Sequence, residues 1–155
     1  MASSTRGQPS DAPLAPSEIL CNCLAVRQAA RQITQLYDEE LAGTGLRSTQ
    51  YAVLSRLARI APATVQDLAE ALVMDRTTLA HNLKPLEREG LVVMGVAEHD
   101  RRVRQLRLTP AGTAKLKEAR VAWARAQARF EDAYGADDAA ELRRKLARAV
   151  EAART

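Results

Sequence analysis

Apolar residues recur at alternating intervals of four and three residues near the start of the chain. They are Ile19, Cys23, Val26, Ala30, Ile33 and Tyr37. This spacing is typical of a heptad-like apolar seam along one face of an α-helix. We expect Ser17 to cap that helix, and Gly43 and Gly45 to end it because glycine favours left-handed backbone at a helix C-terminus.

Three shorter helices are predicted between residues 48 and 89. The first begins at Ser48, a good N-cap, and ends before Pro62, which cannot continue a helix. Thr64 with Asp67 three residues later is a capping-box-like start for the second helix, and Asp75 is a good N-cap for the third. The core candidates of the first and third helices are Tyr51, Val53, Leu54, Leu57, Leu79, Leu83 and Leu86. Two short helices joined by a tight turn are typical of a helix-turn-helix.

The predicted helix over residues 75–89 has one apolar and one polar side. At 100° per residue, the polar side carries Thr77, His81, Lys84 and Arg88, with Thr78 and Pro85 flanking it. Hydroxyl groups near a helix N-terminus can bond base edges or phosphates, and the helix end itself attracts phosphate. Gly90 is expected to stop this helix.

A basic hairpin is predicted next. Residues 91–94 (LVVM) read as a buried strand, and residues 104–108 return with Leu106 and Leu108 alternating against Gln105 and Arg107. Four arginines lie between residues 101 and 107 with no acidic residue among them. A basic helix followed by a basic hairpin predicts a surface for a nucleic-acid groove. The alternative is an ordinary solvated basic face.

Two more helices complete a fold class that is mainly α with a small β-hairpin. Thr109 and Pro110 form a cap and a first helical residue, and that helix is expected to run to Gly135. A final helix begins at Asp137 and Asp138. The apolar residues of these two helices include Leu116, Trp123, Phe130, Leu142, Leu146, Ala149 and Val150.

Composition narrows the class of protein. The 155 residues are 46% apolar and carry a net charge of +4, but they include only one Trp, three Tyr and one Phe, so Ala, Leu and Val must build the core. No apolar run approaches the roughly 20 residues that cross a bilayer, and residues 1–16 lack the apolar stretch of a secretory signal. We therefore expect a flexible tail over residues 1–16, one domain over residues 17–155, and a cytoplasmic protein without membrane association.

Chemistry-bearing residues are sparse. Cys21 and Cys23 are too few and too close for a disulfide framework, and His81 and His99 are too widely separated to suggest a metal site. The sequence contains no nucleophile–base motif, no phosphate-binding glycine loop and no metal cluster, so we expect neither an enzyme nor a bound cofactor.

Together, these segments resemble the multiple-antibiotic-resistance (MarR) family of bacterial transcriptional regulators. The resemblance covers about residues 17–153. It is carried by STQYAVLSRL, by TVQDLAEALVMDRTTLAHNLKPLEREGLV, by DRRVRQLRLTPAG and by the long helices on either side. It implies a winged helix-turn-helix in an obligate homodimer, with a DNA-binding lobe at about residues 47–109. The helices at about residues 17–43 and 110–153 would form the dimer.

The resemblance also implies which residues bind double-stranded DNA. The recognition helix corresponds to residues 75–89, and its outward residues would face the major groove; the wing would reach a minor groove, where narrow A·T-rich geometry attracts arginine. Asp100 would steady the neighbouring arginines of the wing. The predicted DNA-binding residues are Arg76, Thr77, Thr78, His81, Lys84, Arg101, Arg102 and Arg104. Because the two recognition helices of a dimer lie about 34 Å apart, the expected target is a short inverted repeat.

One branch of the family, the organic-hydroperoxide-sensing repressors, has a reactive cysteine near the start of its first helix. Cys23 falls on that position, and Tyr37 falls on one of two tyrosines that bond the thiolate. Fourteen helical residues separate them by about 21 Å, so they could meet only across a dimer. The second tyrosine position is Ser48 here, and another aromatic position is Arg27. Cys23 and Tyr37 could instead belong to an inert core or to a pocket for a small aromatic or phenolic ligand.

The predicted function is a DNA-binding repressor that a small-molecule ligand or cysteine oxidation releases from its operator. The alternative is a helical protein-interaction module with a winged-helix shape that does not bind DNA. That module would need an apolar surface, or one that suits an acidic partner.

Overall fold

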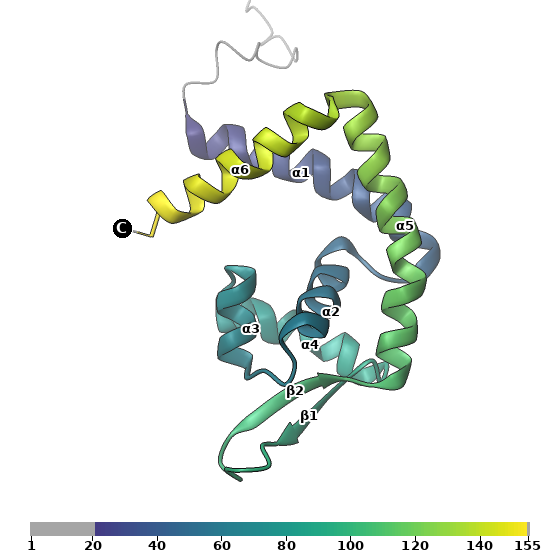
Figure 1. Ribbon diagram of the computed structural model, residues 1–155, viewed down its shortest axis with the longest axis vertical. Helices are drawn as coiled ribbons and strands as arrows, with labels where there is room; N and C mark the ends of the chain where they lie inside the picture. The colour runs from purple at the N-terminus through teal and green to yellow at the C-terminus, as the bar shows by residue number, and fades with distance from the viewer. Residues whose placement is uncertain (1–20, 155) are drawn as a thin grey trace, which may run out of the picture. The chain divides into compact units, whose positions relative to one another are not determined.

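A computed structural model of the chain describes residues 21–154 (Figure 1). The tail at residues 1–16, the cap at Ser17 and the seam residue Ile19 lie outside the described residues. The helices are α1 (Asn22–Leu41), α2 (Ser48–Ile60), α3 (Val65–Leu72), α4 (Arg76–Arg88), α5 (Pro110–Tyr134) and α6 (Ala136–Ala152), with a short 3-10 helix, η2 (Ala42–Thr44). The strands are β1 (Val92–Val96) and β2 (Arg104–Leu108). The fold class is therefore the predicted one, mainly helical with one antiparallel hairpin. No helix in this part of the chain is long and apolar enough to cross a membrane.

Among the described residues, those from Ile33 onward form one compact unit, and residues 21–32 belong to another. Within the larger unit, α2, α3 and α4 pack together, and the hairpin extends from them. Helix α5 starts beside the base of the hairpin and contacts α2, and α6 follows it after a turn. In the smaller unit, the seam residues Cys23, Val26 and Ala30 are exposed.

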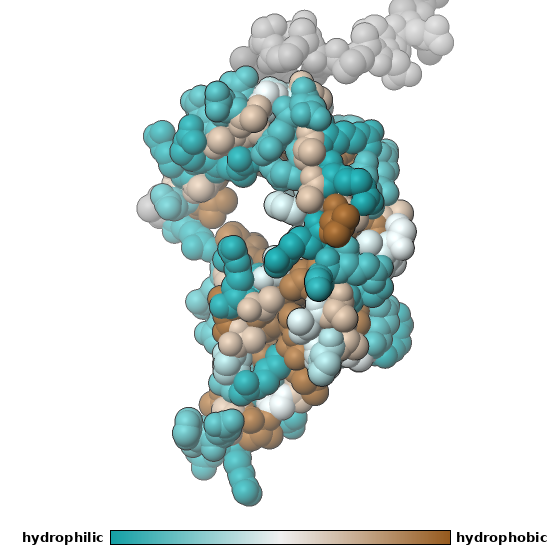
Figure 2. Space-filling model, turned by 45° about the vertical axis from the view of Figure 1, so that its right-hand side comes forward, coloured by the Kyte–Doolittle hydropathy of each residue, from teal (hydrophilic) through white to brown (hydrophobic). Residues whose placement is uncertain are grey.

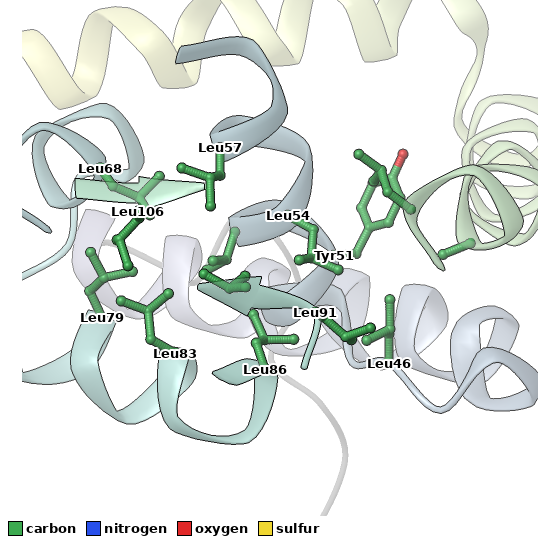
Figure 3. Close-up of a cluster of buried hydrophobic side chains, with 14 of the residues drawn as sticks. Leu46, Tyr51, Leu54, Leu57, Leu68, Leu79, Leu83, Leu86, Leu91 and Leu106 are labelled. Carbon is green, nitrogen blue, oxygen red and sulfur yellow. The ribbon is translucent and has the colours of Figure 1, made fainter. Parts of the chain in front are cut away.

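Leucine side chains fill the core of the larger unit (Figure 3). Leu54 and Leu57 of α2 meet Leu68 of α3 and the buried face of α4, whose Leu79, Leu83 and Leu86 are at most 3% exposed. Leu106 of β2 closes the cluster and is fully buried. These contacts confirm the apolar side predicted for residues 75–89, because burying it turns the opposite face of α4 toward solvent.

Local side-chain caps fix the starts of α3, α4 and α5. Thr64 and Asp67 form the predicted capping box of α3, and the Thr109 side chain accepts from the Gly112 N–H at the start of α5. The prediction that Ser48 caps α2 is wrong, since Arg47 occupies the N-cap position and Ser48 is already helical. The Ser48 N–H instead donates to the Asp38 carboxylate at 2.6 Å. A residue ten positions away therefore takes the role expected of a local cap.

The hairpin is less buried than its sequence suggests. Residues 91–94 were predicted as a buried strand, but the strand is Val92–Val96 and only Val92 within it is buried. Val93, Met94 and Val96 are exposed because only the base of the hairpin packs on the helices. Val92 pairs with Leu108 and Val96 with Arg104 in antiparallel register.

Two contacts fix the base of the hairpin. Ala63, in the α2–α3 connection, exchanges backbone hydrogen bonds with Leu106 of β2 at 2.7 and 3.3 Å. On the other side, the Thr109 hydroxyl donates to the Gly90 carbonyl at 2.6 Å and the Thr109 N–H to the Leu91 carbonyl at 3.1 Å. A Cβ on Gly112 would overlap that Leu91 carbonyl oxygen. The first turn of α5 thus packs directly on backbone where α4 leads into β1.

Candidate nucleic-acid interface

The N-terminus of α4 is organised by Asp75. One carboxylate oxygen accepts from the Thr78 N–H at 2.8 Å, and the other accepts from the Thr78 hydroxyl at 2.6 Å. The hydroxyl bond, and then the backbone bond, hold the pKa of Asp75 below its ordinary value. The carboxylate therefore stays ionised at neutral pH, and the proton of the Thr78 hydroxyl is committed to it.

The predicted outward residues of α4 do face solvent. Thr77, Thr78, His81 and Lys84 are all exposed. They form one polar face that begins at the helix N-terminus, where the Asp75 carboxylate already accepts from the Thr78 N–H. The structure thus brings together the hydroxyl, imidazole and ammonium groups expected of a recognition helix.

Arg76 is held by the neighbouring helix. Its Nε donates to the side-chain oxygen of Gln66 on α3, and the Gln66 amide donates to Glu70. The terminal nitrogens of Arg76 remain available. The sequence pattern did not indicate Gln66, because this contact depends on how α3 and α4 pack.

The tip of the hairpin is a turn built on Asp100. Its carboxylate accepts from the Arg102 backbone N–H at 2.9 Å, and its carbonyl accepts from the Val103 N–H at 3.0 Å. The Ala97 N–H donates to the Val103 carbonyl at 2.9 Å and closes the turn. Asp100 was expected to steady neighbouring arginines. The carboxylate of Asp100 contacts Arg102 through the backbone N–H, and no ion pair within residues 21–154 involves this carboxylate.

The basic groups of α4 and the hairpin lack acidic partners. Arg101, Arg102 and Arg104 are exposed, and none of them, nor Lys84, joins any ion pair in the described part of the chain. Hydrophilic side chains cover the end of the hairpin in Figure 2. Because no described residue neutralises these charges, they are available to phosphates.

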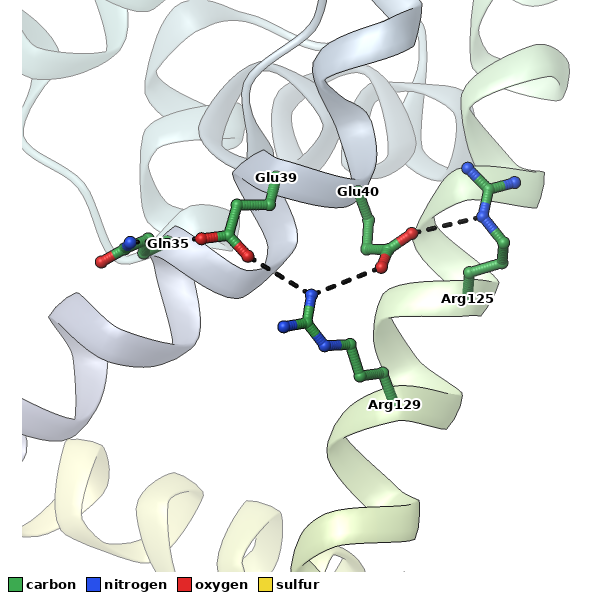
Figure 4. Close-up of polar contacts among 5 residues, drawn as sticks. All are labelled: Gln35, Glu39, Glu40, Arg125 and Arg129. Carbon is green, nitrogen blue, oxygen red and sulfur yellow. Dashed lines mark hydrogen bonds and ion pairs between the residues drawn. The ribbon is translucent and has the colours of Figure 1, made fainter.

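Two arginines of α5 are neutralised by acidic residues of α1. Arg125 of α5 pairs with Glu40 at 3.3 Å, and Arg129 pairs with Glu39 at 3.3 Å and Glu40 at 3.5 Å (Figure 4). These pairs tie the C-terminal part of α1 to α5. These paired arginines thus join helices, in contrast to Arg101, Arg102 and Arg104 of the hairpin region.

The candidate redox or ligand residues have separate surroundings. The Tyr37 hydroxyl donates to Gln127 at 2.5 Å, and the Gln127 amide donates to Glu131 at 2.6 Å. Burial, and then the charge of Glu131, raises the pKa of Tyr37. Cys21 and Cys23 are free thiols and both are exposed. The interpretation of Cys23 as an inert core residue is therefore wrong for a single chain, which leaves it accessible.

A cavity of about 580 Å³ lies beside Tyr37, between α2 and α5. Tyr51 and Trp123 stack there with ring centroids 5.9 Å apart. The cavity is lined by Tyr37, Ser48, Tyr51, Ala52, Ser55, Arg56, Arg59, Leu72, Arg120 and Trp123. We call it the aromatic cavity. Its three arginines carry no ion pair within the described residues, so it offers flat apolar surface and positive charge together.

The sequence pattern did not indicate these arginines. Arg56 and Arg59 lie three residues apart on the exposed side of α2, which is also the ordinary spacing of a solvated face. Between residues 21 and 154, no group of three or more His, Cys, Asp or Glu side chains could hold a metal ion.

Comparisons with known proteins agree with this geometry. The family model described as MarR family matches residues 44–103. The organic hydroperoxide resistance transcriptional regulator of Bacillus subtilis (strain 168) is 32% identical over 96 residues, which are 62% of this chain and 65% of the relative. The solved structure of the M. tuberculosis transcriptional regulator MosR in complex with DNA is 36% identical with a TM-score of 0.76, and covers 87% of this chain and 99% of MosR.

A second solved structure extends the similarity over more of the chain. The PcaV transcriptional regulator from Streptomyces coelicolor, in complex with its natural ligand, is 25% identical with a TM-score of 0.78, and covers 92% of this chain and 99% of PcaV. The arrangement of α2, α3, α4 and the hairpin is a winged helix-turn-helix, with the hairpin as its wing. The chain belongs to the MarR family of transcriptional regulators, and it is a regulator rather than an enzyme.

Proposed function

We propose that this regulator is a repressor that binds an inverted-repeat operator as a homodimer. The observation that carries the proposal is a set of exposed hydroxyl groups and of basic groups without an ion pair among the described residues, all on α4 and the wing. Thr77, Thr78, His81 and Lys84 would meet base edges and phosphates in the major groove. Arg102 would enter a minor groove, with Arg101 and Arg104 beside it.

Exposed apolar side chains on the long helices support the homodimer. Leu146 and Val150 of α6 are 40% and 38% exposed, and Val26 of α1 is 49% exposed. A single chain leaves these residues in water, although their spacing is that of a packed helix face. A second copy of the chain would cover them.

The aromatic cavity supports release by a small ligand. Stacked Tyr51 and Trp123 offer a surface for an aromatic ring, and Arg56, Arg59 and Arg120 offer charge for a carboxylate. We therefore propose an aromatic acid as the effector class. PcaV was solved with its natural ligand, which shows that a regulator of this architecture binds a small molecule.

Oxidation is the alternative route of release. Cys23 is an exposed free thiol, and the similar Bacillus subtilis protein is named for organic hydroperoxide resistance. The proton of Tyr37 is already donated to Gln127. To bond a partner's thiolate, Tyr37 would have to leave Gln127.

A salt titration of DNA binding tests the proposal. Wild-type protein should bind an inverted repeat upstream of its own gene, with an affinity that falls linearly in log–log plots against salt. Arg102→Ala should reduce the salt slope by about 1 for each chain. Arg154→Ala, which removes an exposed arginine near the C-terminus, is the matched control and should leave the slope unchanged. Equal salt slopes for both variants would show that the wing does not contact DNA. Absence of binding to any upstream repeat would refute the proposed repressor function.

The same assay separates the two effectors. Benzoate or 4-hydroxybenzoate should weaken DNA binding of wild type but not of Arg59→Gln. Peroxide should weaken binding of wild type and of Cys21→Ser, but not of Cys23→Ser. An unchanged affinity after one treatment would exclude that effector while leaving the DNA-binding function intact.

A further inference from the structure

A second cavity, of about 550 Å³, lies where the wing joins α5. Its lining residues are Ala58, Ala61, Arg107, Leu108, Thr113, Leu116, Lys117 and Arg120. We call it the wing-base cavity. It combines residues from α2, β2 and α5, three elements that contact one another.

One face of α5 supplies half of the lining. Thr113, Leu116, Lys117 and Arg120 follow the spacing that places residues on a single side of a helix. Leu116 is 5% exposed and packs in the core. Packing of Leu116 in the core therefore fixes the rotation of α5 about its axis. It thereby fixes the positions of Lys117 and Arg120 beside the cavity.

The charge of the wing-base cavity is one-sided. Arg107, Lys117 and Arg120 are three cations, and no acidic residue of the described chain lines the cavity with them. None of the three side chains makes an ion pair or a hydrogen bond within residues 21–154, whereas Lys115, two residues before Lys117, pairs with Glu118 at 3.0 Å. Like charges around one cavity repel each other, so a bound anion would offset an existing electrostatic cost.

The types of cation indicate the chemistry of that anion. Two guanidinium groups present forked donors that match phosphate oxygens bidentately, and a lysine adds a point charge. Ala58, Leu108 and Leu116 give the cavity an apolar wall as well. A group with several negative oxygens satisfies three separate cations better than a single carboxylate can.

We propose that the wing-base cavity is a binding site for a small phosphate-bearing anion, held by Arg107, Lys117 and Arg120. Arg120 also lines the aromatic cavity. Its five N–H donors can serve both cavities, so the two sites share one residue. Anion binding at the wing base does not depend on the proposed DNA-binding function, because it uses none of the residues assigned to DNA.

Calorimetry with inorganic pyrophosphate, in the absence of DNA, tests the site. Wild type should bind one pyrophosphate per chain at moderate salt, and Arg107→Gln and Lys117→Gln should each weaken that binding at least fivefold. Arg102→Gln, at the wing tip, is the matched control and should bind as wild type does. These side chains are exposed, so the glutamine variants should unfold at the temperature of wild type.

A chemical readout places the anion at a single residue. Pyrophosphate should protect Lys117 from acetylation by acetic anhydride, as measured by mass spectrometry, and should leave Lys84 on α4 reactive. Binding that is lost in Arg102→Gln and retained in Arg107→Gln would assign pyrophosphate to the DNA-binding face and overturn the proposal. Absence of binding to wild type at millimolar pyrophosphate would also overturn it.

Discussion

Replacing Gly112 by alanine should destabilise the protein strongly, although alanine is the better helix former. A Cβ at this position would overlap the Leu91 carbonyl oxygen, which is backbone and cannot rotate away. Overpacking of this kind costs about 1–3 kcal/mol. Moving α5 away would also stretch the two hydrogen bonds from Thr109 to Gly90 and Leu91, each contributing about 1 kcal/mol. The two costs together give an expected loss in free energy of unfolding of about 3–5 kcal/mol.

Urea denaturation followed by Trp123 fluorescence measures this loss, since Trp123 stacks on Tyr51 in the same unit. Protein concentration must be held constant, because dimerisation would couple to unfolding. Gly95→Ala is the matched control: a Cβ on Gly95 meets no atom within 4 Å, and the residue lies in β1. A free energy of unfolding for Gly112→Ala within about 0.5 kcal/mol of wild type would show that α5 does not pack on Leu91 as described.

Three further predictions concern single side chains. His81→Ala should change the sequence preference of DNA binding more than its salt slope, because base-edge contacts specify the DNA sequence and phosphate contacts do not. Selection from random operators would refute this if His81→Ala and wild type chose the same sequence. Asp75 has a lowered pKa, so its contribution to stability is present above its unfolded pKa and disappears as the pH falls through the folded pKa. In urea titrations, the free energies of unfolding of Asp75→Asn and wild type should therefore converge at low pH. A difference between them that stays constant with pH would contradict the bond to Thr78. Tyr37 has a raised pKa, so its contribution to stability is present below its unfolded pKa near 10 and is lost as the pH rises through the folded pKa. Tyr37→Phe should lower the free energy of unfolding by about 1 kcal/mol at pH 8, because it removes the bond to Gln127. A difference between wild type and Tyr37→Phe that widens toward pH 11 would refute this.

Local patterns were enough to predict most of the elements. Asp75 and Thr109 cap the helices they were expected to cap, and Gly90 and Gly135 lie where α4 and α5 end. Each of these features depends on residues within four positions of the backbone concerned. The leucine face of α4 was equally predictable, because a helix has a fixed period.

Contacts between distant residues were not predictable in the same way. Asp38 accepts from the N–H of Ser48 at the start of α2, and Gln66 holds Arg76, because packing brings separate helices together. The exposure of Val93 could not be read from an apolar run, which looks alike on a protruding hairpin and in a core.

The residues of the candidate site were predictable where they all lie on one helix. They were not predictable where several helices contribute them. The shared exposed face of Thr77 and Lys84 on α4 followed from the helical period alone. The arginines of the aromatic cavity were missed, since Arg59 and Arg120 come from α2 and α5 and share a cavity only after folding.

The bond from the Thr78 hydroxyl to Asp75 gives that threonine a fixed polarity. With its proton already donated, the oxygen can only accept. In the major groove, the exocyclic amines of adenine and cytosine donate, whereas guanine and thymine present acceptors at the corresponding edge. If α4 lies in a major groove as proposed, the base opposite Thr78 should therefore be adenine or cytosine. The carboxylate of Asp75, which would have no contact with DNA itself, would then restrict one base of the operator to two choices.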